Sequence, residues 1–420
     1  MKFLLGFLLA AASLTSATVQ LFPKDPIVSL QLYADLEELA RLVDIAYCVG
    51  STSLGIASPF RCLSRCAEFP AFELVTTFNT GLLFSDSCGY IALDHDRRRI
   101  IVAFRGTYSL VDTIVDLSTI PQEYVPFPGN GDSDKDGQSD DGQQSLACNN
   151  CTVHAGFYSS WLSTRSIIVP YLQANIARLP GYKLHLVGHS LGGAIAALAG
   201  LDFLSRNWSP TVTTFGEPRI GNAALNRFLD DRFGLKHSSN TTSFPQPTHG
   251  PEVSDKIVIG VDHLTYRRVT HINDPVPLLP PRNVIIGDYS PHAGEIFISS
   301  SAPPPELSSV RHCEGDSDIN CSSSQDNHKK PEEEPSESER NPTRSNLLAG
   351  VQHELIEARA REDPWWDGGL PPERYRFWQL FWAHREYFVK IGLCIPGGEG
   401  ILLDEQGHAK KFDMHEKTDL

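Results

Sequence analysis

Apolar residues follow two different spacings along this chain. Helical spacing predicts helices over residues 29–48 and 157–178, and a pattern of small residues predicts another over 194–204. Apolar runs that end at polar turns predict strands, which include Phe72–Phe78, Gly89–Asp94, Arg99–Phe104, Val212–Phe215, Leu264–Ile272 and Glu295–Ser299. Strands that alternate with helices indicate an α/β fold with a mainly parallel sheet covered on both faces.

A Gly-x-Ser-x-Gly sequence, Gly188-His189-Ser190-Leu191-Gly192, lies between an apolar run and one of these helices. The order of strand, sharp turn and helix is the context of a nucleophile elbow, in which the serine backbone is strained and bulky neighbours would clash. Bare Gly-x-Ser-x-Gly is common by chance, but this flanking makes the motif specific. We therefore predict that Ser190 is a nucleophile.

Composition and the chain start define the class of protein. The chain has 420 residues, of which 41% are hydrophobic and 21% charged, as in a globular protein with one large α/β domain. A formal net charge of −15 argues against nucleic acid as a partner, because phosphates would be repelled. Lys2, the short apolar stretch 3–12 and the small residues 15–17 predict a signal peptide over residues 1–17. No later run is long enough for a transmembrane helix, so we expect a secreted protein.

The expected domain organisation is a single domain over residues 18–400, followed by a C-terminal tail over 401–420. A Ser-, Pro-, Glu- and Asp-rich insert interrupts it around residues 301–345, with predicted disorder at 331–342. Asp132, Asp134 and Asp136 imitate a calcium loop, but Gln143 stands where a bidentate Glu is required. We therefore interpret residues 129–146 as a solvated loop and expect neither a metal nor another cofactor.

Nine cysteines suit an oxidising compartment. Pairs close in sequence are Cys62 with Cys66, Cys148 with Cys151, and Cys313 with Cys321. Half of a zinc site is the alternative for Cys148 and Cys151, but no second pair has matching spacing. We expect Cys88 to be a buried thiol outside any disulfide. Asn-x-Ser/Thr sequences make four asparagines candidates for glycosylation, namely Asn150, Asn207, Asn240 and Asn320.

A serine nucleophile needs a base, and the base needs an acid that orients it. On this kind of sheet both partners follow the serine, with the acid first. Asp274 is the best-placed acid, directly after a predicted strand, and Asp262 and Asp288 are its rivals. Sequence alone leaves the base open among the histidines after Ser190, which are His237, His249, His263, His271, His292, His312, His328, His353, His384, His408 and His415.

The negative oxygen of a tetrahedral intermediate needs hydrogen-bond donors. One is expected from the backbone N–H of Leu191, and the second from Thr107, which follows a predicted strand and Gly106. Residues 108–117 then form an amphipathic helical pattern, with one apolar side made of Leu110, Val111, Ile114 and Val115.

Taken in order, several segments resemble the secreted fungal class 3 lipases. They are Phe104–Thr107, Val153–Phe157, Gly188–Gly193, Thr214–Gly221, Asn273–Pro277, Ala383–Phe388 and the closing Cys394. The resemblance implies an α/β-hydrolase fold and a catalytic triad of Ser190, Asp274 and His384, which selects His384 over its rival His292. It also implies oxyanion roles for Thr107 and Leu191, and disulfides Cys48–Cys394, Cys62–Cys66 and Cys148–Cys151.

In that family a short helix after the oxyanion motif is a lid over the acyl groove, and residues 108–116 occupy its place. Thr113 stands where the well-studied lipases have Trp, so a fixed packing element is the alternative to a lid. The resemblance implies a secreted triacylglycerol lipase without cofactors, whose partner is an ester or lipid substrate at a lipid–water interface. The alternatives are an esterase for soluble esters, such as feruloyl esters, and an inactive secreted binding protein.

Overall fold

The structure is a computed structural model that describes residues 28–50, 55–81, 87–107, 121–128, 147–235, 264–280, 288–301, 303–326 and 382–395, together with the backbone of two short strands, β13 (Leu402–Leu403) and β14 (Ala409–Lys410). Its helices are α1 (Leu30–Ala46), α3 (Ala155–Arg178), α4 (Leu191–Ser205), α5 (Ala223–Phe233) and α6 (Ser323–Asp326), with 3-10 turns η1 (Arg65–Glu68), η3 (Val276–Leu278) and η4 (Leu307–Ser309). The predicted helices at 29–48, 157–178 and 194–204 correspond to α1, α3 and α4.

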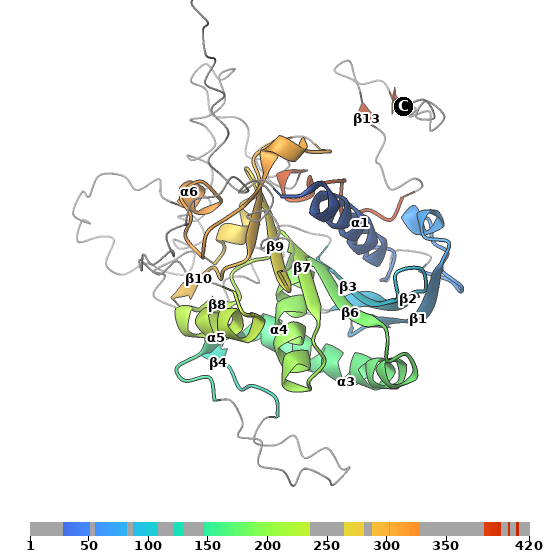
Figure 1. The fold of residues 1–420 in the computed structure, drawn as a ribbon, viewed down its shortest axis with the longest axis horizontal. Helices are drawn as coiled ribbons and strands as arrows, with labels where there is room; N and C mark the ends of the chain where they lie inside the picture. Colours follow the sequence, from blue (N-terminus) through green and yellow to red (C-terminus); the bar gives the residue numbers. More distant parts are fainter. Residues whose placement is uncertain are drawn as a thin grey trace, which may run out of the picture.

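An eight-stranded sheet forms the centre of the fold (Figure 1). Its strands, in spatial order, are β1 (Phe72–Asn79), β2 (Cys88–Asp94), β3 (Arg99–Arg105), β6 (Lys183–His189), β7 (Thr211–Phe215), β9 (Tyr266–His271), β11 (Glu295–Ile298) and β12 (Val310–His312). From β3 to β11 neighbouring strands are parallel, whereas β1, β2 and β12 pair antiparallel with their neighbours. The mainly parallel sheet expected from the sequence is therefore present, with antiparallel strands at both edges.

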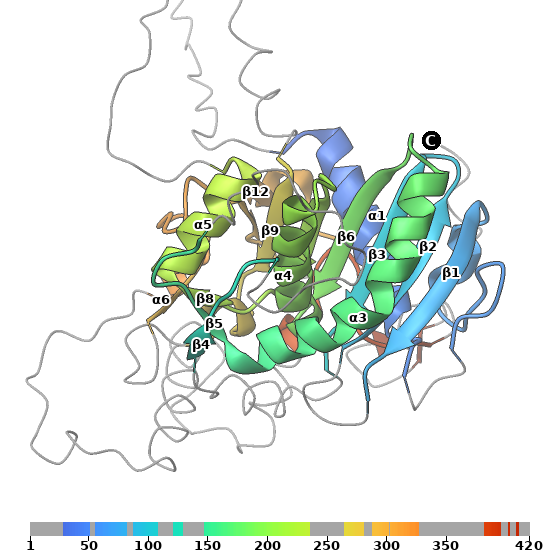
Figure 2. The same ribbon diagram turned by 90° about the horizontal axis from the view of Figure 1, so that it is seen from below.

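Both faces of the sheet are covered. Helix α1 lies against one face, and α3 and α4 lie against the other (Figure 2). Along β3, Ile100, Val102 and Phe104 belong to the core on the α4 side, while Ile101 and Ala103 belong to the core on the α1 side. Successive strand residues point to opposite faces, so a strand covered on both sides must be apolar throughout.

A second, four-stranded sheet consists of β10 (Tyr289–Ser290), β8 (Gly221–Asn222), β5 (Thr152–His154) and β4 (Pro121–Glu123), in spatial order. Sequence analysis identified neither this sheet nor helix α5. The strands of the small sheet have two or three residues each, which is too short for an alternating pattern to be recognised.

Part of the segment predicted as a low-complexity insert is ordered against the main sheet. Strand β12 pairs with β11, and a disulfide joins Cys313 to Cys321. The predicted disorder at 331–342, the calcium-like loop at 129–146 and the signal peptide at 1–17 lie outside the described residues.

Within the described parts of the chain, every helix is too short or too polar to cross a lipid bilayer.

Candidate active site

Ser190 occupies the sharp turn between β6 and α4. Its backbone has φ 58° and ψ −131°, a conformation that non-glycine residues rarely adopt and that persists only where the surroundings enforce it. A hydrogen bond of 2.9 Å from the Ser190 N–H to the carbonyl oxygen of Phe215 holds the turn against β7. This is the geometry of the nucleophile elbow expected from the sequence motif.

The glycines of the motif are required by close backbone packing. A Cβ at Gly188 would lie 2.2 Å from the carbonyl oxygen of Gly192, and a Cβ at Gly192 would lie 2.3 Å from that of Phe104. Real side chains cannot approach backbone so closely, so only glycine lets β6, α4 and β3 meet at this point.

Asp274 and His384 form a buried pair beside this turn. Asp274 follows β9, and its carboxylate oxygens lie 3.0 and 2.9 Å from His384 Nδ1. The Val276 N–H donates to Asp274 Oδ1 at 2.9 Å, and the Tyr387 hydroxyl donates to Asp274 Oδ2. His384 Nε2 is buried and makes no hydrogen bond to any described residue. The imidazole is thus oriented through one nitrogen and has an available lone pair on the other.

The pKa of Asp274 reflects these contacts. Burial acts to raise it, but the neighbouring His384 charge and the hydrogen bonds from His384, Tyr387 and the Val276 N–H outweigh burial and lower the pKa below its ordinary value. Asp274 is therefore an anion at neutral pH, which favours a proton on His384 Nδ1.

His189 connects the strand of Ser190 to the histidine of this pair. The rings of His189 and His384 are 4.6 Å apart between centroids, and His189 Nε2 lies 2.8 Å from the His384 carbonyl oxygen. On its other side, His189 Nδ1 lies 2.6 Å from the Tyr47 hydroxyl, which accepts from the Gly106 N–H at 3.0 Å. Because the His384 carbonyl oxygen can only accept, His189 carries a proton on Nε2, and in the neutral ring Nδ1 accepts from the Tyr47 hydroxyl. Burial first, and then the His384 charge, lower the pKa of His189 and keep it neutral.

The two predicted oxyanion donors lie on neighbouring elements. Leu191 is the first residue of α4, where backbone N–H groups have no partner within the helix. Thr107 is half-buried and follows Gly106 at the end of β3. A Cβ at Gly106 would lie 2.6 Å from the Cβ of Ser190, so this loop packs directly against the serine. The predicted lid residues Leu110, Val111, Ile114 and Val115 lie outside the described residues.

The rival residues have other positions. His292 lies with Nε2 3.0 Å from Glu217 and Nδ1 2.7 Å from the Ala293 carbonyl oxygen. His271 ends β9, and its carbonyl oxygen accepts from the Asp274 N–H. Asp288 is exposed, and Asp262 lies outside the described residues. The structure brings the His384 imidazole to the Asp274 carboxylate, whereas the His292 imidazole lies against Glu217.

Sequence analysis missed two tyrosines of this site, Tyr47 and Tyr387. Tyr387 follows His384 by three residues in an aromatic cluster, and Tyr47 precedes Cys48 at the end of α1. Each supplies a hydroxyl to the site, but nothing local in a pattern of aromatic residues separates such a tyrosine from one that only fills the core.

The segment that carries His384 is fastened to α1. A disulfide joins Cys48, at the end of α1, to Cys394 in this segment. Two other disulfides join Cys62 to Cys66 and Cys148 to Cys151, and the Cys88 thiol is buried. The Gly392 N–H and the Ser64 hydroxyl donate to the buried carboxylate of Asp44, at 2.9 and 2.8 Å. Burial is the main cause that raises the pKa of Asp44 to about 6.

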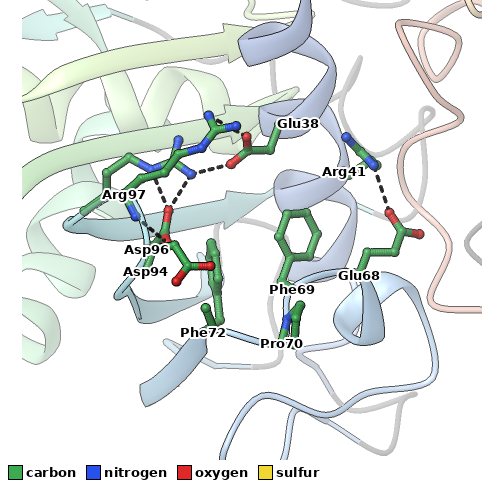
Figure 3. A pocket seen from close by; sticks show the side chains of 11 residues that line it. Glu38, Arg41, Glu68, Phe69, Pro70, Phe72, Asp94, Asp96 and Arg97 are labelled. Carbon is green, nitrogen blue, oxygen red and sulfur yellow. Dashed lines mark hydrogen bonds and ion pairs between the residues drawn. The ribbon is translucent and has the colours of Figure 1, made fainter.

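A polar pocket of about 220 Å³ lies at the opposite end of the sheet, near the turn between β2 and β3 (Figure 3). Its arginines are paired: Arg97 with Glu38 at 2.7 Å, Arg41 with Glu68 at 3.2 Å, and Arg99 with Glu38 and Asp94. Arg99 begins β3, whereas Ser190 follows the carboxyl end of the adjacent parallel strand, so the pocket is separate from the serine site.

One group among the described residues has the spacing of metal ligands, Glu295 with Cys313 and Cys321. The two cysteines are joined in a disulfide, so they have no thiolates to offer a metal.

Comparisons with known proteins identify the family of this chain. The family model described as lipase (class 3) matches residues 101–284. The chain is 42% identical to Lipase A of Sodiomyces alcalophilus, over 94% of this chain and 90% of that protein. It is also 42% identical to secreted mono- and diacylglycerol lipase 2 of Gibberella zeae, over 89% of this chain and 84% of that protein.

Among solved structures, the Lip2 lipase of Yarrowia lipolytica is similar, with a TM-score of 0.62 and 28% identity over 89% of this chain and 98% of that one. The central sheet with helices on both faces is the α/β-hydrolase fold of these fungal enzymes. The protein therefore belongs to the class 3 lipases, a family of serine ester hydrolases.

Proposed function

We propose that this protein is a secreted lipase that hydrolyses acylglycerols through a triad of Ser190, His384 and Asp274. The observation that supports the triad is the His384–Asp274 pair, because the His384 ring lies 4.6 Å from that of His189, the residue before Ser190, and its Nε2 makes no hydrogen bond to any described residue. The names of the relatives, which include a secreted mono- and diacylglycerol lipase, support the substrate class and the secretion.

The chemistry follows from these positions. His384 Nε2 takes the hydroxyl proton as Ser190 Oγ attacks the ester carbonyl, and Asp274 stabilises the imidazolium that forms. The Leu191 N–H and Thr107 donate to the negative oxygen of the tetrahedral intermediate. His384 then gives the proton to the leaving alcohol, and an acyl group remains on Ser190. A water molecule, deprotonated by His384, releases the carboxylic acid and restores the serine.

Ser190→Ala tests the nucleophile. We expect hydrolysis of a diacylglycerol emulsion to fall by at least about a thousandfold, because the remaining groups only bind and polarise the ester. An activated fluorophosphonate should label the wild-type protein at Ser190 and leave this variant unlabelled. Ser163→Ala, which removes an exposed hydroxyl from α3, is the matched control and should keep both activity and labelling. Labelling of another serine, or full activity in Ser190→Ala, would contradict the proposal.

The substrate class is tested separately by comparing hydrolysis rates on emulsified and on dissolved esters. A lipase that acts at lipid–water interfaces should hydrolyse emulsified diacylglycerol and triacylglycerol faster than a short-chain ester below its solubility limit. A higher rate on the soluble short-chain ester would identify an esterase and leave the triad assignment intact.

A further inference from the structure

The hydroxyl of Tyr387 contacts Asp274, the proposed acid of the site. It is buried, at 1% exposure, and its hydroxyl lies 2.5 Å from Asp274 Oδ2. Because a carboxylate only accepts hydrogen bonds, the tyrosine must be the donor. Asp274 thus receives donors from three directions, namely His384 Nδ1, the Val276 N–H and the Tyr387 hydroxyl.

One tight turn delivers both His384 and Tyr387 to the same carboxylate. The Tyr387 N–H donates to the Val389 carbonyl oxygen at 3.3 Å, and the Ile391 N–H donates to that of Arg385 at 2.9 Å. The phenol ring then packs edge-on against Phe215, with 5.6 Å between centroids. The hydroxyl is therefore held in place by the same backbone that holds the imidazole.

Gly216 leaves room for this arrangement. A Cβ there would lie 2.7 Å from the Tyr387 hydroxyl, 2.8 Å from His384 Cε1 and 3.0 Å from Asp274 Oδ2. The close approach of all three groups to one glycine shows that Tyr387 shares the packing of the pair and is not a distant core residue.

The hydroxyl remains a donor wherever Asp274 is ionised. Burial, and then the adjacent Asp274 charge, raise the pKa of Tyr387 well above its ordinary value, so the phenol does not ionise near neutral pH. A donor on Oδ2 withdraws negative charge from the carboxylate. A carboxylate with less charge stabilises the imidazolium less, which makes His384 a weaker base and a better acid.

We propose that Tyr387 is a positioning residue for the acid of the triad, one that fixes the Asp274 carboxylate and sets the basicity of His384. This inference rests on the proposed function, because it assigns Tyr387 to the same reaction. The elements packed around Asp274, His384 and Tyr387 carry other titratable or charged groups that also influence the pH profile. They are Tyr47, His189, Arg268, His271, Glu295 and Arg385.

Tyr387→Phe removes the hydroxyl and keeps the ring. We expect kcat to fall by about ten- to a hundredfold, the range for loss of a hydrogen bond to a charged group, with KM changed by less than about twofold. The acid limb of the kcat/KM profile should move to higher pH, because Asp274 then stabilises the imidazolium more strongly. A purely structural role would lower the amount of active enzyme and leave the position of this limb unchanged.

Tyr90→Phe is the matched control. Tyr90 is also fully buried on the α1 side of the sheet, and its hydroxyl donates to the Leu42 carbonyl oxygen at 2.8 Å. This variant should lose comparable stability in thermal unfolding and keep the wild-type pH profile. The same shift in both variants, or a wild-type kcat and profile in Tyr387→Phe, would overturn the positioning role.

Site-specific 3-fluorotyrosine at position 387 provides a second measurement, independent of the folding of Tyr387→Phe. Its phenol is a stronger donor, so the acid limb should move in the opposite direction, to lower pH; an unmoved limb would overturn the proposal. Ser190→Ala separates the two hypotheses. Full activity in Ser190→Ala overturns both the proposed function and the role of Tyr387. If Ser190→Ala is inactive but Tyr387→Phe keeps the wild-type pH profile, only the role of Tyr387 is overturned.

Discussion

At the scale of single residues, the site depends on backbone conformations that ordinary side chains avoid. Ser190 has a positive φ without being glycine, and Gly216 has φ +61° at the wall of the His384–Asp274 pair. Strain of this kind costs of order 1–3 kcal/mol and persists where the surrounding structure enforces it. Here β6, β7 and α4 enforce it through the hydrogen bond from Ser190 to Phe215 and the packing of the motif glycines.

Gly216→Ala should reduce activity far more than stability. The added methyl would contact His384, Asp274 and Tyr387 at 2.7–3.0 Å and displace the imidazole. A misplacement of about 1 Å costs on the order of a hundredfold in rate, so we expect at least that loss in kcat/KM.

Gly234→Ala is the control for this prediction. Gly234 has a similar φ of +66° at the end of α5, but a Cβ there would meet nothing within 4 Å. The Gly234→Ala variant should be less stable than the wild type by about 1 kcal/mol in urea unfolding and should keep full activity. Equal activity in the two variants would show that Gly216 serves only the backbone.

At the scale of elements, helix α1 anchors the segment that carries His384. The Cys48–Cys394 disulfide joins positions 346 residues apart, and Tyr33 on α1 packs against Phe388 at 5.0 Å between ring centroids. Asp44 of the same helix accepts a hydrogen bond from the Gly392 N–H. The position of His384 therefore depends on contacts outside the sheet, whereas Ser190 and Asp274 lie close after the ends of β6 and β9.

Replacing Cys48 and Cys394 with serine should uncouple activity from global folding. A disulfide that closes so long a loop contributes about 2–5 kcal/mol, and its loss should first loosen the segment around His384. In a urea titration, we expect ester hydrolysis to disappear at a lower concentration than the far-ultraviolet circular dichroism signal.

The Cys313→Ser, Cys321→Ser variant is the matched control, because it opens a loop of eight residues next to β12 and away from α1. Its activity and its circular dichroism signal should be lost together. Coincident transitions in the Cys48 and Cys394 variant would contradict an anchoring role for that disulfide.

At the scale of the whole molecule, Asp44 is a buried carboxylate at the junction of three parts of the chain. It accepts hydrogen bonds from Ser64, beside the Cys62–Cys66 disulfide, and from Gly392 in the terminal segment, while Arg65 Nε lies 3.7 Å away. Because burial raises the pKa of Asp44 to about 6, from 3.8, folding favours its protonated form. Its contribution to stability is complete below about pH 4 and is lost as the pH rises through 6.

We expect the unfolding free energy of the wild type, relative to that of Asp44→Asn, to decrease by roughly 2 kcal/mol between pH 4 and pH 7. Groups that titrate in both proteins cancel in this difference, so chemical denaturation at a series of pH values isolates Asp44. A difference that stays constant, or that rises with pH, would contradict a raised pKa at this position.

The sequence by itself determined the features that depend on near neighbours. Short-range spacing predicts the strands that are apolar on both faces, the amphipathic helix α1 and the Gly-x-Ser-x-Gly turn. Side chains alternate between two faces along a strand and repeat about every 3.6 residues along a helix, so each element has a recognisable pattern. The position of Asp274 after β9 follows as well, since an acid on this kind of sheet lies at a strand end. Helix α5 was missed although its buried Leu225, Leu229 and Phe233 have helical spacing, and β12 was missed because it is only three residues long.

Residue spacing left open which groups meet Asp274: the resemblance to class 3 lipases selected His384, and the tertiary structure shows the contacts of His384 and Tyr387 with this carboxylate. His384 is 110 residues away along the chain, and several histidines lie closer in sequence. The selection depends on the path of the intervening chain and on the fastening of residues 382–395 to α1, neither of which has a local pattern. The donor role of Tyr387 was hidden for the same reason: a buried tyrosine becomes a partner for a carboxylate only when distant segments bring the two together.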